Sequence, residues 1–145
     1  MPLHHIDTSV ILELPEKTED DKCCKRYMQK ASYNFMGKIS FPALSELFAL
    51  TMGVKDSNKQ HAFLDAFADL IDVRKLEFYA PENIYETAIK IKKLDTRLKT
   101  LDTDIIACAI EDKAVNLVTL DQKLIGHRSI EAEFGLKIIH PRDLL

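Results

Sequence analysis

Several residue types are scarce in this chain, and each scarcity argues against a class of protein. The sequence has only three cysteines, Cys23, Cys24 and Cys108, and no tryptophan. An odd count with one adjacent pair is not a disulfide framework, and it suits a reducing cytosol. No Cys and His residues have the spacing of a zinc site. We therefore expect neither a disulfide-rich secreted domain nor a structural zinc fold.

Long apolar runs and an excess of basic charge are also missing. No stretch approaches the ~20 apolar residues of a membrane span, and "MPLHHID" lacks the pattern of a secretory signal. The formal net charge is −3, which excludes a strongly basic nucleic-acid coat but not a local basic patch. The length suits one domain, residues 1–145, and we expect it in the cytoplasm.

Strand-like and helix-like segments alternate along the chain. The segments "LHHID", "KLEFYA", "VNLVT" and "LKIIH" have strand character, and "KISF" is a weaker candidate. Thr18 suits a helix N-cap, Pro42 and Pro81 suit first helical positions, and Ser57 with Gln60 forms a capping box. This order predicts an α/β fold, in which a mostly parallel sheet is covered by helices on both faces.

Four acidic residues occupy positions that are typical of a binding or catalytic site. Asp7 ends the first predicted strand and Asp121 follows "VNLVT", so both belong to the edge of the sheet where ligands bind in open α/β folds. Glu46 has only apolar neighbours three and four residues away, and Asp104 begins the apolar segment "DIIACAI". Each acid could instead cap a helix or begin one, because acids are favoured there.

Taken together, the four acids predict a metal site. Carboxylates gathered at the mouth of one sheet would repel one another and raise each other's pKa, and a divalent cation would remove that conflict. Carboxylate oxygens alone suit Mg²⁺ or Mn²⁺ rather than zinc.

The segment "LDTD" offers two acids for one ligand position. Two residues on a helix are about 200° apart, so Asp102 and Asp104 could not both face one metal. We place Asp102 before the first helical turn, as a cap, and choose Asp104 as the ligand.

The segments "IDTSVIL", "ALSEL", "DIIACAIE" and "VTLD" have the order and spacing of the four acidic motifs of PIN-domain ribonucleases. Over its whole length the chain resembles the VapC-type toxins of toxin–antitoxin modules. The resemblance implies a three-layer fold with a five-stranded parallel sheet, in which "KISF" is a strand. It also implies a metal-binding acidic pocket that consists of Asp7, Glu46, Asp104 and Asp121, with the nearby hydroxyl residues Ser9 and Thr119.

The activity implied by the resemblance is metal-dependent hydrolysis of RNA phosphodiester bonds, with Mg²⁺ or Mn²⁺ as cofactor. The implied partners are the RNA substrate, a small antitoxin protein and a second copy of the chain in a homodimer. The family's last motif often has a basic residue before the aspartate and an aromatic residue shortly after it. This chain has Leu120 and Leu124 there, so its substrate contacts depart from the family pattern.

A basic segment, "KIKKLDTRLK", precedes the third acidic motif and contains Lys90, Lys92, Lys93, Arg97 and Lys99. It predicts a rim that contacts phosphates without reading sequence. The alternative is an ordinary solvated helix face. His4, His5, His127 and His140 have no partners at ligand spacing, and we interpret them as ordinary surface or core residues.

Other functions remain open at the level of sequence. A haloacid dehalogenase-type phosphatase needs a second aspartate two residues after the first, where this chain has Ser9. A Toprim nuclease has its DxD motif after a strand, whereas "DTD" here follows a basic segment. A housekeeping RNA-processing nuclease would look nearly the same as a toxin. A non-catalytic PIN-like domain that binds RNA or a partner is the alternative that is not an enzyme.

Overall fold

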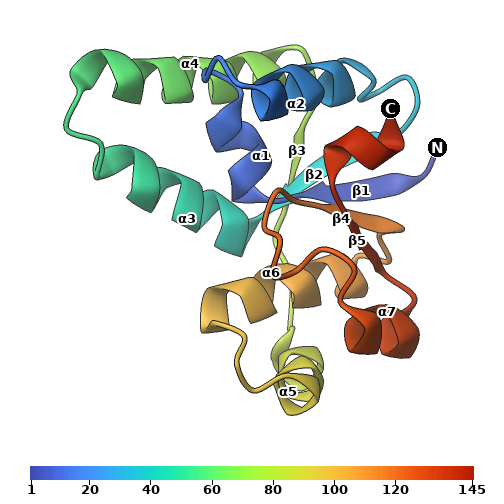
Figure 1. The fold of residues 1–145 in the computed structure, drawn as a ribbon. Helices are drawn as coiled ribbons and strands as arrows, with labels where there is room; N and C mark the ends of the chain where they lie inside the picture. Colours follow the sequence, from blue (N-terminus) through green and yellow to red (C-terminus); the bar gives the residue numbers. More distant parts are fainter.

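The computed structural model describes residues 1–145 and contains one five-stranded sheet between two layers of helices (Figure 1). The strands are β1 (Leu3–Ile6), β2 (Met36–Ser40), β3 (Glu77–Tyr79), β4 (Asn116–Val118) and β5 (Lys137–Ile139). They lie in the order β3-β2-β1-β4-β5, and every neighbouring pair is parallel. The predicted α/β architecture is confirmed, and "KIS" of the "KISF" segment lies in β2, whereas Phe41 begins the next helix.

Seven α-helices connect the strands. On one face lie α1 (Thr8–Glu13), α2 (Glu19–Gln29) and α4 (Ser57–Asp72), and on the other lie α5 (Tyr85–Leu94), α6 (Thr100–Glu111) and α7 (Arg128–Phe134) (Figure 1). The remaining helix, α3 (Phe41–Met52), contacts both α1 and α6, so it bridges the two layers. A short 3-10 helix, η1 (Pro141–Leu144), packs on α2. None of the helices combines the length and the apolar character that crossing a bilayer requires.

The topology creates a crevice at the carboxyl edge of the sheet. The chain runs outward from β1 to β2 and β3, and then returns to place β4 on the other side of β1. The backbone N–H of Asp7 donates to the carbonyl of Val118 across this junction, at 2.9 Å. Ligands of open α/β sheets bind where the strand order reverses in this way. The residues that follow β1 and β4 therefore face the expected binding region.

The apolar core holds α6 firmly against the sheet. Ile105, Ile106 and Ala109 of α6 are buried together with Ile6 of β1 and Leu117 of β4. Burial on most sides explains why residues 105–110 of this helix are all apolar. The first turn of α6 is therefore held rigidly at the carboxyl edge of the sheet.

Two helix starts differ from the sequence prediction. The N-cap of α4 is Asp56, not Ser57, because the Asp56 carboxylate accepts from the backbone N–H groups of Asn58 and Lys59. Helix α5 begins at Tyr85 rather than at Pro81, and a turn in which Asn83 Oδ1 accepts from the Tyr85 N–H precedes it. The N-caps Thr18 of α2 and Ser40 of α3 accept from backbone N–H groups three residues on.

The start of a third helix, α6, also differs from the prediction, and this difference affects the functional site. Helix α6 begins at Thr100 with Lys99 as its N-cap, so Asp102 and Asp104 are both helical. The prediction that Asp102 precedes the first turn is wrong. The buried Leu98 packs into the core just before the helix, and the Thr103 hydroxyl donates to the Lys99 carbonyl, so the helix starts earlier than predicted.

Candidate functional site

Asp7 lies at the centre of the carboxyl edge and is buried, with 6% of its surface exposed. Its Oδ2 accepts a hydrogen bond from Thr119 Oγ1 at 2.7 Å and another from Ser9 Oγ at 2.9 Å. Burial raises the pKa of Asp7, the nearby charge of Asp121 raises it further, and the two hydroxyl groups oppose the shift. The two hydroxyl residues thus hold this carboxylate in one orientation.

The same hydroxyl groups join the loops that follow β1 and β4. Ser9 Oγ accepts from the Leu120 N–H and Thr119 Oγ1 from the Asp121 N–H, each at 3.0 Å. The Lys123 N–H in turn donates to Asp121 Oδ1 at 2.9 Å. Asp7 and Asp121, which are far apart in sequence, are therefore fixed relative to each other by a continuous hydrogen-bond network.

Glu46 enters the site from α3 and is half-buried. Burial raises its pKa, and the charges of Asp7 and Asp102 raise it further, whereas Lys99 and the Thr8 hydroxyl oppose the shift. Because such charge effects act at close range, Glu46 faces the same crevice as Asp7.

The charged surroundings of Asp102 and Asp104 distinguish these two residues. Burial raises the pKa of Asp102, and the charges of Asp7 and Asp121 raise it further. The pKa of Asp104 is raised by burial alone, without a charged neighbour from the crevice. Since the two positions are about 200° apart on α6, the structure turns Asp102 toward the other acids and Asp104 away from them.

The choice of Asp104 as the third acid rested on the wrong helix start, and the geometry favours Asp102 instead. The sequence contained little to reveal this, because Thr100 and Thr103 are both residues of the kind that caps helices. Without a defined start, the phase of the helix was open.

A pocket of about 510 Å³ adjoins the acids. Its lining consists of three acidic residues, three basic residues and two leucines, namely Asp95, Arg97, Leu98, Lys99, Asp102, Asp121, Lys123 and Leu124. The basic groups oppose the rise in the pKa of Asp102, with contributions from both Lys99 and Lys123. The pocket can therefore admit an anion despite its acids.

Only part of the predicted basic rim reaches this pocket. Arg97 and Lys99 line it, whereas Lys92 and Lys93 do not. Lys92 Nζ donates to the Leu98 carbonyl and supports the loop before α6. Lys123, which the sequence analysis did not single out, lies on the opposite loop and completes the rim.

The donor set fits a divalent cation in its chemistry. Asp7, Glu46, Asp102 and Asp121 offer carboxylate oxygens, the ligands of Mg²⁺ and Mn²⁺, and the mutual repulsion of these acids is what a cation would relieve. No three His, Cys, Asp or Glu side chains are already arranged to hold a metal ion. Direct coordination by three of them would need the side chains to converge, and water-mediated contacts would need less movement.

His4 and His5 lie away from the four acids, whereas His127 contacts Asp95 at the pocket. His4 is buried, and its ring nitrogens lie 2.7 Å from Tyr27 Oη and 3.0 Å from Asn116 Nδ2. Burial lowers the pKa of His4 to about 4. His5 lies 2.7 Å from Asp112 and is likewise buried. These residues belong to the core, as predicted.

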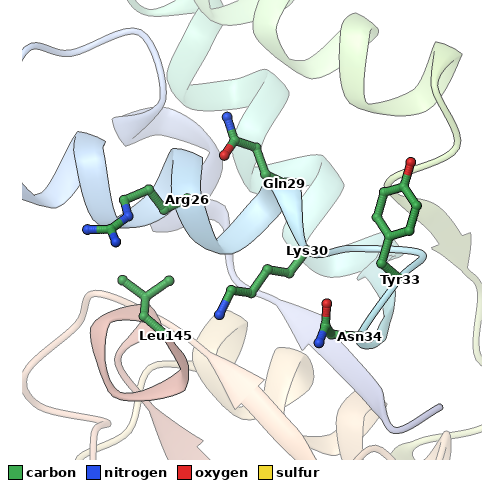
Figure 2. A pocket seen from close by; sticks show the side chains of 6 residues that line it. All are labelled: Arg26, Gln29, Lys30, Tyr33, Asn34 and Leu145. Carbon is green, nitrogen blue, oxygen red and sulfur yellow. The ribbon is translucent and has the colours of Figure 1, made fainter.

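A second pocket, of about 330 Å³, lies between α2, the turn before β2 and the last residue of the chain. Figure 2 shows its lining side chains, which are Arg26, Gln29, Lys30, Tyr33, Asn34 and Leu145. No Asp, Glu, His or Cys side chain lines it, so it lacks the carboxylates that would hold a divalent cation.

Comparison with known proteins agrees with this geometry. Residues 5–128 match the sequence model of the family described as PIN domain. No curated protein matches the chain significantly in sequence. Among solved structures, VapBC2 from Rickettsia felis, crystallised with a DNA fragment from its promoter, superposes with a TM-score of 0.70 and 17% identity over 95% of this chain and 98% of the other.

Two structures from Mycobacterium tuberculosis are also similar in fold. VapBC-5, of the VapBC family of toxin–antitoxin systems, has a TM-score of 0.69 and 14% identity over 97% of this chain and 99% of its own. VapC20, described as a toxin that cleaves the sarcin–ricin loop, has a TM-score of 0.63 and 18% identity over 90% and 95% of the two chains. The family match covers most of the sequence, so this chain belongs to the PIN domain family.

Proposed function

We propose that this chain is an endoribonuclease that hydrolyses RNA phosphodiester bonds with Mg²⁺ or Mn²⁺, residues 1–145 forming one nuclease domain. The observation that carries the proposal is that Asp7, Glu46, Asp102 and Asp121 lie at the carboxyl edge of the sheet, where the charges of Asp7, Asp102 and Asp121 raise the pKa values of neighbouring acids. Membership of the PIN domain family and the similarity in fold to a toxin described as cleaving the sarcin–ricin loop support it.

Asp7, Asp102 and Asp121 would hold the cation, directly or through water, and Glu46 would complete the set. The bound cation would supply Lewis acidity at the phosphate and a more acidic coordinated water. Asp104, the third acid chosen from sequence, is left out of this set because Asp102 lines the pocket and Asp104, about 200° away on α6, does not.

The protein's own groups have separate tasks in the proposed reaction. Ser9 and Thr119 orient the Asp7 carboxylate by donating to its Oδ2. Glu46 lies beside Asp7 and Asp102, from where it can orient the attacking water and accept its proton. Water attacks phosphorus as the bond to the leaving ribose oxygen breaks, and that oxygen takes a proton from solvent.

Arg97, Lys99 and Lys123 would bind backbone phosphates at the rim of the pocket. Such contacts position a nucleic acid without reading its sequence. Lys93 lies outside the pocket on the exposed face of α5, and Lys92 is engaged with the Leu98 carbonyl, so we assign neither a part in binding the cleaved phosphate.

We further propose that the chain is the toxin of a toxin–antitoxin pair and acts in the cytoplasm. The VapBC complexes with a similar fold support a small antitoxin protein as partner. By the same analogy we propose a homodimer. A non-catalytic RNA-binding domain is the second candidate, because no three acids are already arranged around a metal position.

The test is a cleavage assay on a mixture of structured and single-stranded RNAs with Mg²⁺, with Mn²⁺ and with chelator. We expect cleavage with either cation, none with chelator, and none by the Asp102→Asn variant. RNA binding without cleavage under every metal condition would support the second candidate and contradict the first.

A further inference from the structure

Asp95 lines the acidic pocket but differs from the other acids, because its carboxylate is fully engaged. Its Oδ2 lies 2.9 Å from His127 Nε2, and its Oδ1 accepts from the backbone N–H of Arg97 at 3.0 Å. Arg97 Nε also donates to Oδ1, at 3.3 Å. These bonds lower the pKa of Asp95 to about 2, with the His127 contact as the largest cause. Both oxygens of Asp95 thus already accept hydrogen bonds from the protein.

His127 uses both of its ring nitrogens. It is the N-cap of α7, and its Nδ1 accepts from the Ile130 N–H at 3.4 Å. Nδ1 must therefore be unprotonated, and the ring proton lies on Nε2, where it is donated to Asp95. The side chains of Asp95 and His127 are 11% and 13% exposed, so water screens this contact only weakly.

The contact joins the two loops that carry the basic rim. Asp95, Arg97 and Lys99 belong to the loop between α5 and α6, whereas Lys123 and His127 belong to the segment between β4 and α7. The Asp95–His127 contact therefore links the loop of Arg97 to the segment of Lys123 through a side-chain hydrogen bond.

We propose that Asp95 and His127 are positioning residues that hold Arg97 opposite Lys123, so that the two sides of the pocket grip successive phosphates of a single RNA strand. This rests on the proposed function and deepens it. Asp95 acts through Arg97 by fixing both its backbone and its guanidinium, and His127 acts by fixing Asp95.

The chain contains a matched control elsewhere. His140 Nε2 lies 3.2 Å from Asp20 Oδ1, and His140 Nδ1 accepts from the Arg142 N–H at 3.0 Å as the N-cap of η1. The residue types and the capping role of the histidine are the same as in the Asp95–His127 pair, but Asp20 is more exposed, and neither Asp20 nor His140 lines the acidic pocket. Asp20→Asn therefore removes a contact of the same kind at a place where it does not touch the rim.

The experiment measures binding of a single-stranded oligoribonucleotide to metal-free protein, together with kcat and KM for cleavage. In Asp95→Asn, the amide N–H₂ or the lost charge disrupts the contact with His127. We expect the Kd and the KM to rise by roughly tenfold, as when a supporting hydrogen-bond partner is lost. We expect kcat to stay within about twofold, because the group acts on ground-state binding.

Two further variants make the test specific. His127→Asn retains an acceptor for the Ile130 N–H and removes only the contact with Asp95, so it should reproduce the effect even if Asp95→Asn folds poorly. In an Arg97→Ala background, Asp95→Asn should weaken RNA binding no further, because its effect passes through Arg97.

Each outcome decides between the proposals. If the wild-type chain cleaves RNA but Asp95→Asn and His127→Asn bind it as tightly as Asp20→Asn does, the positioning role is wrong and the nuclease function stands. If kcat falls and KM does not change, the role is also wrong. If the wild-type chain neither binds nor cleaves RNA, the proposed function is wrong, and the positioning role, which depends on it, is wrong as well.

Discussion

The two ends of α6 each carry an aspartate, and their surroundings are opposite. At the C-terminal end, Asp112 Oδ2 lies 2.7 Å from His5 Nε2 and 3.3 Å from Lys38 Nζ. At the N-terminal end, Asp102 has no ion pair, and its neighbours Asp7 and Asp121 raise its pKa. The helix dipole alone would favour the reverse, since it stabilises an acid at the N-terminus and opposes one at the C-terminus.

The difference separates a structural acid from a functional one. Asp112 has cationic and hydrogen-bonding partners that offset its loss of hydration, so its contacts stabilise the fold without a ligand. Asp102 lies among like charges, and the protein supplies only Lys99 and Lys123 to oppose them. Such an arrangement stores an unfavourable interaction that a bound cation can relieve, which is typical of functional sites.

The largest expected effect concerns the two acids at the start of α6. Asp102→Asn should reduce metal-dependent RNA cleavage by at least about 100-fold, because even groups that only support a metal ligand contribute 10- to 100-fold. Asp104→Asn should retain most activity, since Asp104 faces away from the crevice. Cleavage rates of both variants at saturating metal decide between them. Loss of activity in Asp104→Asn alone would restore the assignment made from sequence.

Metal binding should stabilise the protein through Asp102 at the N-terminal end of α6 and not through Asp112 at the C-terminal end. At a metal concentration about 100 times the Kd, the free energy of unfolding should rise by ~2.7 kcal/mol. Thermal melts with Mg²⁺ or Mn²⁺ at constant ionic strength measure this gain. The gain should disappear in Asp102→Asn and persist in Asp112→Ala; equal gains in both variants would mean that the cation binds elsewhere.

Removing the structural acid should lower stability but spare activity. Asp112→Ala leaves the buried His5 without its partner, and His5 Nδ1 already lacks one. We expect a loss of about 1–3 kcal/mol in the free energy of unfolding, as for other unsatisfied buried groups. Cleavage per folded molecule should not change. Denaturant unfolding gives the loss, with Glu133→Ala on the exposed surface as a control; a loss no greater than that of the control would contradict the comparison.

The smallest expected effect is on the pH dependence of stability in the metal-free protein, where the crevice acids and Asp95 should act in opposite directions. Asp7, Glu46 and Asp102 have raised pKa values in the folded state, so they destabilise it above those values and the penalty disappears as the pH falls through them. Asp95, with a pKa lowered from 3.8 to about 2, stabilises the fold above pH 3.8 and loses that contribution as the pH falls toward 2.

We therefore expect metal-free Asp102→Asn to melt above the wild-type chain at neutral pH. The difference between their melting temperatures should vanish as the pH approaches 3.8, where Asp102 of the wild type is also protonated. Melting curves across a pH series measure this difference. A gap of constant size would mean that the Asp102 charge does not destabilise the fold.

The sequence by itself determined the strands, most helices and three of the four acids that the structure brings together. Strand character and short-range capping are local properties, and Asp7 and Asp121 each follow a strand directly, so their edge of the sheet could be predicted. Glu46 could be recognised because an acid in an apolar stripe is unusual.

Only the tertiary structure decided between Asp102 and Asp104, placed Lys123 opposite Arg97 and paired Asp95 with His127. The start of α6 depends on how Leu98 and Ile105 pack into the core, and local sequence does not define it. Each residue turns a helix by about 100°, so an error of two residues in the start transfers the functional role to the opposite face. Contacts between side chains more than 30 residues apart, such as Asp95 and His127, exist only once the sheet has brought their loops together.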